Sequence, residues 1–326
     1  MGNLEAPVRR ADGFFHRTID VGAVHLHVAE ARPRLPSGKL SDGTETVDAD
    51  VPLVVLMHGF PEFWWSWRHQ LRALADAGIW AVAPDMRGYN ESDKPVGVAS
   101  YELEALADDI AGLVRALGRK KAIIVGHDWG AMVAWIVAQR HPSLVSRLAI
   151  LNVPHAVQML RGLRRPKQLR KSWYMFFFQL PGGIPERMVA KDDWAYLRKM
   201  FASEGFAPDE IEPYVQAMAK PGAITAAMSY YRAAIRRTLK GRALKSTRID
   251  CPVLVIWGDR DRHLGKEMAE PPPRFVPNAR VEHIPDATHW VQNSAPEKVN
   301  ALLLAFVQHE GPISSRSSPD SSRRMP

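Results

Sequence analysis

The sequence predicts an α/β fold in which helices cover both faces of a mostly parallel sheet. Three observations lead to this prediction: apolar runs recur along the chain, helical segments separate them, and a glycine-flanked turn joins one run to a helix. Strands that are buried on both faces have such near-continuous apolar runs, and parallel strands need long crossover connections. The runs lie at 52–58, 80–86, 122–127, 148–153, 252–258 and 279–285.

The first part of the chain has a different pattern. Two short alternating runs, 14–21 and 23–31, predict a β-hairpin with its turn at Gly22. Residues 32–50 are polar and rich in turn formers, which predicts a loop. Between 101 and 118 the apolar residues recur at helical spacing, which predicts a helix that covers the sheet.

The alternation of strands and helices stops between residues 155 and 248. This stretch has helical patterns and no strong strand pattern. We therefore expect 1–154 and 249–310 to form the two parts of one α/β core, and 155–248 to form a helical cap over the strand ends. Residues 311–326 are poor in apolar side chains, which predicts a disordered tail.

Composition restricts the class of protein. No apolar run approaches the ~18 residues of a membrane span, and the N-terminus lacks a signal-peptide pattern, so we expect a cytoplasmic protein without an integral membrane segment. The single cysteine, Cys251, cannot form an internal disulfide. No P-loop, dinucleotide fingerprint or clustered metal-ligand spacing is present, so we expect no cofactor and no metal. The sequence does not decide whether the chain forms a homodimer.

The positive charge is concentrated in the expected cap. Residues 155–248 hold 18 lysines and arginines against 7 acidic residues, whereas the rest of the chain has a net charge of −3. A solvated helix face is the simpler interpretation, and contact with an anionic lipid or acidic partner is the alternative. No motif supports binding to nucleic acid.

The turn after the run 122–127 carries the clearest chemical signal. Gly126-His127-Asp128-Trp129-Gly130 follows a strand pattern and precedes a helical pattern. In the same context, Gly-x-Ser-x-Gly presents a nucleophilic serine above a sheet. Here the central residue is Asp128, which we expect to be the nucleophile. The alternative is an aspartate that only caps the helix.

A carboxylate nucleophile restricts the substrate. A free aspartate has a pKa of about 3.9, so it is ionised at neutral pH without the help of a base. Attack on a saturated carbon gives an alkyl ester, which water can hydrolyse, whereas a serine would give an inert ether. Asp128 therefore points to epoxides or alkyl halides rather than to ordinary esters or amides.

Hydrolysis of that ester needs a base and a carboxylate that orients the base. Asp261 follows the run 252–258 and His289 follows the run 279–285, in the chain order nucleophile, acid, histidine. We expect His289 to activate water and Asp261 to hold its tautomer, with Asp259 as the alternative acid. The oxyanion would be bound by the backbone N–H groups of Trp129 and Phe60.

Three motifs carry a resemblance to a known family. The segments 58–68 (HGFPEFWWSWR), 85–89 (DMRGY) and 126–130 (GHDWG) are similar to those of soluble epoxide hydrolases of the α/β-hydrolase fold superfamily, of the bacterial type. The resemblance runs from about residue 14 to residue 309. It implies the α/β-hydrolase fold, conversion of an epoxide and water to a vicinal diol, and a small apolar epoxide as the substrate. The family's spacing favours Asp261 over Asp259.

The resemblance also implies two acids in the cap. Tyr174 precedes the segment 178–182 (FQLPG) and Tyr231 precedes Arg232, as do the tyrosines that bind the epoxide oxygen in this family. Tyr230 is the neighbouring alternative to Tyr231. A phenol can protonate the basic alkoxide that ring opening produces. We also expect an apolar pocket with these further lining residues: Phe60, Trp64, Trp129, Met175 and Phe178.

Two other functions remain as alternatives. Haloalkane and haloacid dehalogenases share the Asp-His-Asp triad, but haloalkane dehalogenases usually place Asn or Trp where Phe60 stands. Fluoroacetate dehalogenases place a His-Trp pair where this chain has Trp173-Tyr174. A non-catalytic binding protein of the same fold is the second alternative. Such proteins tend to lose a triad member, and this chain retains all three.

Overall fold

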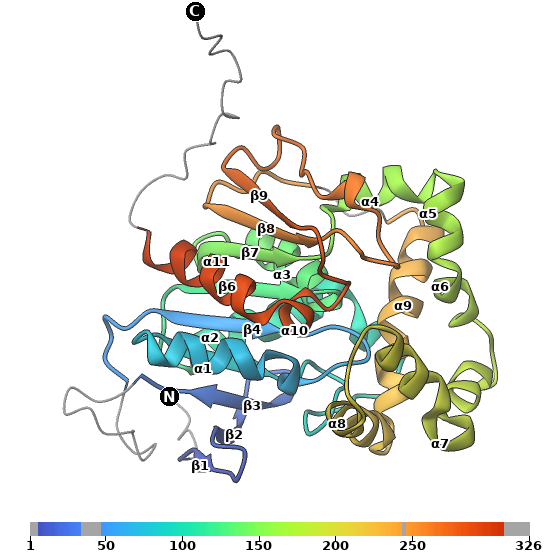
Figure 1. The fold of residues 1–326 in the computed structure, drawn as a ribbon, viewed down its shortest axis with the longest axis horizontal. Coiled ribbons are helices and arrows are strands. Elements are labelled where there is room, and N and C mark those ends of the chain that lie inside the picture. Colours follow the sequence, from blue (N-terminus) through green and yellow to red (C-terminus); the bar gives the residue numbers. More distant parts are fainter. Residues whose placement is uncertain (1–5, 34–46, 243–245, 310–326) are drawn as a thin grey trace, which may run out of the picture.

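One nine-stranded sheet forms the centre of the described part of the chain (Figure 1). The computed structural model describes residues 6–33, 47–242 and 246–309. The strands are β1 (Val8–Arg9), β2 (Phe15–Asp20), β3 (His25–Ala31), β4 (Leu53–Met57), β5 (Trp80–Pro84), β6 (Ala122–His127), β7 (Val145–Leu151), β8 (Val253–Gly258) and β9 (Ala279–Ile284).

The strand order is β1-β2-β3-β5-β4-β6-β7-β8-β9. Strands β1, β2, β3 and β5 pair in antiparallel fashion, and all pairs from β5 to β9 are parallel. In β4 and β6 every residue is buried, as expected for strands that are covered on both faces. The predicted α/β architecture with a mostly parallel sheet is confirmed.

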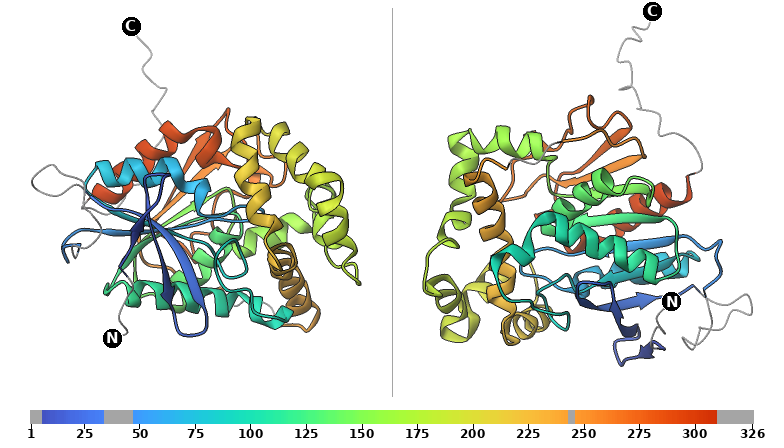
Figure 2. Two further views of the ribbon diagram at one scale, coloured as in Figure 1. Left: turned by 90° about the horizontal axis from the view of Figure 1, so that it is seen from below. Right: turned by 180° about the vertical axis from the view of Figure 1, so that it is seen from behind.

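Helices cover both faces of the sheet (Figures 1 and 2). One face packs against α2 (Leu103–Ala116) and α3 (Trp129–Arg140). The other face packs against α1 (Arg68–Asp76), α10 (Val291–Ser294) and α11 (Pro296–Gln308). The helix expected over 101–118 is α2. The predicted loop 32–50 lies partly outside the described residues, and the predicted tail 311–326 lies wholly outside them.

Six helices lie between β7 and β8: α4 (Ala156–Leu163), α5 (Pro166–Lys171), α6 (Trp173–Phe177), α7 (Ile184–Ser203), α8 (Pro208–Ala219) and α9 (Ala223–Leu239). Figure 1 shows this helical segment at one end of the sheet, where the parallel strands end. Helix α7 is broken at residues 191–194, and Asp192, Asp193 and Trp194 have positive φ angles. No helix among the described residues is both long and apolar enough to cross a membrane.

A buried ion pair connects the core to helix α9. Arg87, in the loop after β5, donates to both carboxylate oxygens of Asp109 on α2, from Nε at 2.7 Å and from Nη2 at 2.5 Å. The carbonyl oxygen of Arg87 in turn accepts a 2.7 Å hydrogen bond from the hydroxyl of Tyr230 on α9. Because both charges of the pair are buried, each depends on the other for compensation.

We expect Asp109→Asn to lower the free energy of unfolding by about 3–5 kcal/mol, because it leaves the Arg87 guanidinium buried without a counter-charge. Asp108→Asn is the matched control. Asp108 pairs with Arg140 at the surface, where both side chains are 46% exposed, so its loss should cost less than about 1 kcal/mol. Urea unfolding of both variants measures the difference. Equal losses in the two variants would contradict this account of the buried pair.

Candidate active site

Asp128 sits on a sharp turn between β6 and α3. Its backbone has φ 48° and ψ −122°, which is a strained conformation for a residue with a side chain. The turn depends on glycine at both flanks: a Cβ on Gly126 would overlap the carbonyl of Gly130, and one on Gly130 would overlap the carbonyl of Met57. The side chain of Asp128 therefore leaves the end of the sheet in a fixed direction.

The loop after β4 approaches this turn closely. A Cβ on Gly59 would overlap the side chain of Asp128, so only glycine allows this approach. The backbone N–H of Phe60 donates a hydrogen bond to the Asp128 carboxylate. The backbone nitrogen of Trp129 lies beside Gly59, at the start of α3. Phe60 and Trp129 thus each bring a backbone N–H group to the region where the loop after β4 meets the Asp128 turn.

His289 and Asp261 form a buried pair from the loops after β9 and β8. The Nδ1 atom of His289 lies 2.7 Å from Oδ2 of Asp261. Asp261 also accepts hydrogen bonds from the backbone N–H groups of His263 and Leu264 and from the side chain of Asn152. These contacts hold Asp261 as an ionised acceptor.

Asp259, the alternative acid, points elsewhere. Its carboxylate contacts His283 at 2.6 Å and Lys266 at 3.0 Å at the surface.

Burial and mutual charge set the protonation of these groups. Burial raises the pKa of Asp128 to about 6, although the positive charge of His289 opposes this shift. Burial alone would lower the pKa of His289, but the charges of Asp261 and Asp128 outweigh it and raise this pKa to about 9. Burial likewise opposes ionisation of Asp261, and His289 overcomes it and lowers that pKa to about 2. Near neutral pH the site holds two carboxylates and one imidazolium.

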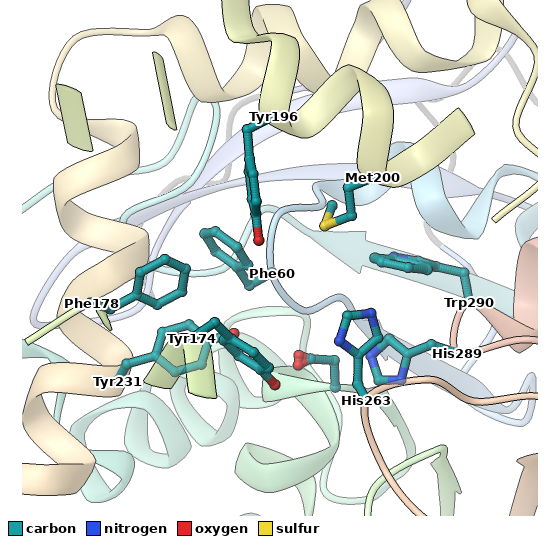
Figure 3. A pocket seen from close by; sticks show the side chains of 10 residues that line it. Phe60, Tyr174, Phe178, Tyr196, Met200, Tyr231, His263, His289 and Trp290 are labelled. Atoms are coloured by element: carbon teal, nitrogen blue, oxygen red, sulfur yellow. The ribbon is translucent and has the colours of Figure 1, made fainter. Parts of the chain in front are cut away.

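A single cavity collects most of the predicted side chains. Phe60, Asp128, Tyr174, Phe178, Tyr231 and His289 all line it. Figure 3 shows Tyr174, Phe178 and Tyr231 on one side of the cavity and His289 on the other. The rings of Tyr174 and Tyr231 meet edge to face, with centroids 5.8 Å apart.

The two neighbouring tyrosines of α9 have different environments. Tyr231 lines the cavity, and its hydroxyl is hydrogen-bonded to the side chain of Trp129. An indole N–H can only donate, so this contact leaves the hydroxyl proton of Tyr231 available for another acceptor. Tyr230 instead uses its hydroxyl on the carbonyl of Arg87. Burial and the charge of Asp128 raise the pKa of both Tyr174 and Tyr231, so both phenols are neutral.

Three expected pocket residues, Trp64, Met175 and Trp129, do not line the cavity; Trp129 packs against Tyr230 and Tyr231 instead. Trp64 packs edge to face against Phe14 and His16, and its backbone N–H donates to Asp85. We therefore correct the prediction that Trp64 lines the pocket. The loop after β4 continues into a short 3₁₀ helix, and this helix directs the indole away from the cavity. Met175, the residue after Tyr174 on α6, packs against the core.

Four lining residues were not foreseen from the sequence: Tyr196, Met200, His263 and Trp290. Tyr196 and Met200 are one helical turn apart on α7, and Figure 3 shows them above the cavity. The ring of His263 stands 5.0 Å from that of His289, and burial together with this charged neighbour lowers the pKa of His263 to about 4. His263 is therefore neutral. The feature of the sequence that could have pointed to His263 was its position two residues after Asp261.

Glu62 is a further carboxylate, fully buried, which supports the loops that carry the site residues. Glu62 accepts hydrogen bonds from the Gly59 N–H at 2.9 Å and from His127 Nδ1 at 2.7 Å. The other ring nitrogen of His127 lies 2.9 Å from the carbonyl oxygen of His289. This pair links the loops that carry Phe60, Asp128 and His289. Among the described residues, no group of three or more His, Cys, Asp or Glu side chains could hold a metal ion.

Comparison with known proteins agrees with this geometry. The family model described as alpha/beta hydrolase fold matches residues 52–296. Epoxide hydrolase 4 of Mus musculus is 37% identical over 270 residues, which cover 79% of this chain and 74% of that protein. An AB hydrolase superfamily protein of Bacillus subtilis is 37% identical over 305 residues, which cover 92% of this chain and 100% of that protein.

A solved structure gives the same result. The crystal structure of a Bacillus megaterium epoxide hydrolase in complex with an inhibitor has a TM-score of 0.78 and 30% sequence identity, and the match covers 90% of this chain and 100% of that one. The chain therefore belongs to the α/β-hydrolase fold family and, within it, to the group that contains the epoxide hydrolases.

Proposed function

We propose that this protein hydrolyses a small apolar epoxide to a vicinal diol through an ester on Asp128. One observation carries the proposal: the Asp128 carboxylate, the imidazole of the His289–Asp261 pair and two neutral phenols all line the same cavity. The similarity to proteins named epoxide hydrolase supports it. The aromatic and thioether side chains of the lining suit an apolar substrate.

In the first step, a carboxylate oxygen of Asp128 attacks one epoxide carbon. A C–O bond to the enzyme forms as the ring C–O bond breaks, and the electron pair moves to the ring oxygen. Tyr174 or Tyr231 then donates its proton to this alkoxide. Attack also removes the negative charge of Asp128, which is one cause of the raised pKa of both phenols. The phenols therefore become stronger acids as the alkoxide forms.

In the second step, water attacks the ester carbonyl. His289 takes one proton from that water, and the N–H groups of Phe60 and Trp129 stabilise the oxyanion. The bond between the Asp128 carbonyl carbon and the substrate oxygen then breaks, and His289 gives its proton to the departing diol. The second proton of the water returns to the phenolate, which restores the Asp128 carboxylate and the tyrosine.

A base must be neutral to accept a proton, yet the pKa of His289 is raised to about 9 in the free enzyme. Asp128 contributes to this shift, and the ester has no charge. Ester formation therefore lowers the pKa of His289 and prepares it for its role.

Dehalogenation is the competing reaction, and the two phenols separate it from epoxide opening. A departing halide is already an anion and needs no proton, whereas an alkoxide does. Two neutral tyrosines that line the same cavity as the nucleophile therefore favour the epoxide.

A single turnover in heavy-oxygen water should place the label in the carboxylate of Asp128 and leave the diol unlabelled. The reason is that the diol's new oxygen comes from Asp128, and water then restores the carboxylate. Mass spectrometry of the peptide that contains Asp128 and of the product measures both. A labelled diol after one turnover would exclude the covalent route.

His289→Gln should allow alkylation and block hydrolysis, so intact-protein mass spectrometry with styrene oxide should show one added substrate mass. In this background Tyr231→Phe should slow alkylation by about a hundredfold, the size of a typical general-acid effect. Adding Tyr174→Phe should nearly stop it. The matched control is Tyr230→Phe, which removes a phenol that does not line the cavity and should alkylate at the parent rate.

If the variant without Tyr174 and Tyr231 phenols alkylates as fast as its parent, both tyrosines are packing residues. Dehalogenation would then be the better proposal, and turnover of haloalkanes or haloacids would support it.

The pKa of His289 should fall in Asp128→Asn, because this change removes a negative charge and imitates the neutral ester. Asp259→Asn is the control, since Asp259 belongs to the same loop as Asp261 but pairs at the surface. NMR titration of imidazole-labelled protein measures the pKa, and His289→Gln assigns the resonance. An unchanged pKa in Asp128→Asn would contradict the proposed activation of the base.

A further inference from the structure

The outer helices of the helical segment combine two kinds of exposed side chain. Residues 156–191 contain eight lysines and arginines and a single acidic residue. That residue, Glu186, is paired with Arg232 at 2.6 Å. The same stretch holds seven of the eleven large apolar side chains that are exposed in the described part of the chain: Leu160, Leu169, Trp173, Phe176, Leu180, Ile184 and Met188.

The helices that carry these side chains lie along one edge of the molecule (Figures 1 and 2). Helices α4, α5, α6 and the start of α7 follow one another along the outer edge of the helical segment, away from the sheet (Figures 1 and 2). On α6 and just after it, the exposed side chains differ from those that line the cavity. Trp173 and Phe176, 55% and 56% exposed, face solvent, whereas Tyr174 and Phe178 line the cavity. We call residues 156–191 the outer surface.

Lys191, at the end of the outer surface, lies 3.6 Å from Asp192, but the basic side chains around α5 have no acidic partner among the described residues. No described acidic side chain pairs with Arg164, Arg165, Lys167 or Arg170. A solvated helix face would explain the charges but not the tryptophan and phenylalanine exposed between them. Contiguous exposed apolar side chains indicate an interaction site.

We propose that the outer surface binds the interface of an anionic phospholipid bilayer. Apolar side chains would enter the boundary between headgroups and acyl chains, and arginines and lysines would contact the lipid phosphates. A bilayer accepts both kinds of side chain at once, because long basic side chains bury their stems and keep their charges at the headgroups. A second copy of this chain is disfavoured as the occupant because it would oppose one strongly positive surface to another.

The direct test is flotation with vesicles at low ionic strength, about 50 mM, where surface charges are weakly screened. Wild type should float with vesicles of phosphatidylcholine containing about one third phosphatidylglycerol, and at least about tenfold less with pure phosphatidylcholine. Binding that is absent, or equal for the two compositions, would overturn the proposal.

Two variants separate charge from insertion. Arg164→Gln/Arg165→Gln/Arg170→Gln should weaken binding by about a hundredfold, at about a fivefold loss for each basic residue. Trp173→Ser/Phe176→Ser should weaken it by at least about tenfold, because it removes the apolar contact. Thermal melting verifies that both variants are folded.

Matched controls exclude an effect of net charge or general stickiness. Arg115→Gln/Lys120→Gln/Lys121→Gln makes the same charge change at the end of α2. Val96→Ser/Leu239→Ser removes two exposed apolar side chains elsewhere. Both should bind vesicles as wild type does. If the controls lose binding as strongly as the variants of the outer surface, the proposal is wrong.

A label that reports polarity tests insertion independently. With Cys251 replaced by Ala, an environment-sensitive fluorophore at Leu180→Cys should shift to the blue on adding anionic vesicles, and one at Val96→Cys should not. Two results point to another occupant. Binding to polyglutamate that needs the arginines but not Trp173 and Phe176 would indicate an acidic protein. The other result is a protein that does not bind vesicles but forms a dimer. If Trp173→Ser/Phe176→Ser dissociates that dimer, the occupant of the outer surface is a second copy of this chain.

Discussion

The buried charge of Glu62 is the constraint on which the site depends. A carboxylate in a fully buried position is tolerated only when hydrogen bonds satisfy it. Glu62 obtains them from Gly59, Ser66, His127 and Gln292, which belong to segments that the sheet brings together from distant parts of the sequence. Any displacement of one of these segments would leave the charge without a partner. The positions of the nucleophile, the oxyanion donors and the base are therefore coupled through one group that touches no substrate.

Much of this arrangement follows from local sequence. The strand pattern, the glycine-flanked Asp128 and the order of Asp261 and His289 are signals within short stretches, because turns and strand ends impose their own residue preferences. The Glu62–His127 pair has no such signal, since its partners are 65 residues apart. Trp64 shows the opposite failure. Its place in an aromatic motif suggested the pocket, but the direction of its ring is set by a turn of 3₁₀ helix that the motif does not reveal.

The cavity wall contributed by α7 was also beyond sequence reasoning. Tyr196 and Met200 follow the break at residues 191–194, where three successive residues have positive φ angles. Such a backbone is rare for residues with side chains, so the pattern of 184–203 suggests one uninterrupted helix. The break changes which face of the second half is turned to the cavity. A helical pattern predicts which residues share a face, but it cannot predict where that face points once the axis changes.

The hydrogen bond from Tyr230 to the Arg87 carbonyl has a consequence for how this protein can change during evolution. Adjacent residues on a helix are rotated by about 100° from one another. One rotational setting of α9, kept by the packing of the Tyr230 ring against Tyr89 and Tyr101 as well as by this hydrogen bond, therefore directs Tyr231 into the cavity. A residue inserted between Tyr230 and Tyr231 would force a choice between the hydrogen bond of Tyr230 and the cavity. The direct adjacency of these two tyrosines is therefore a requirement of the site.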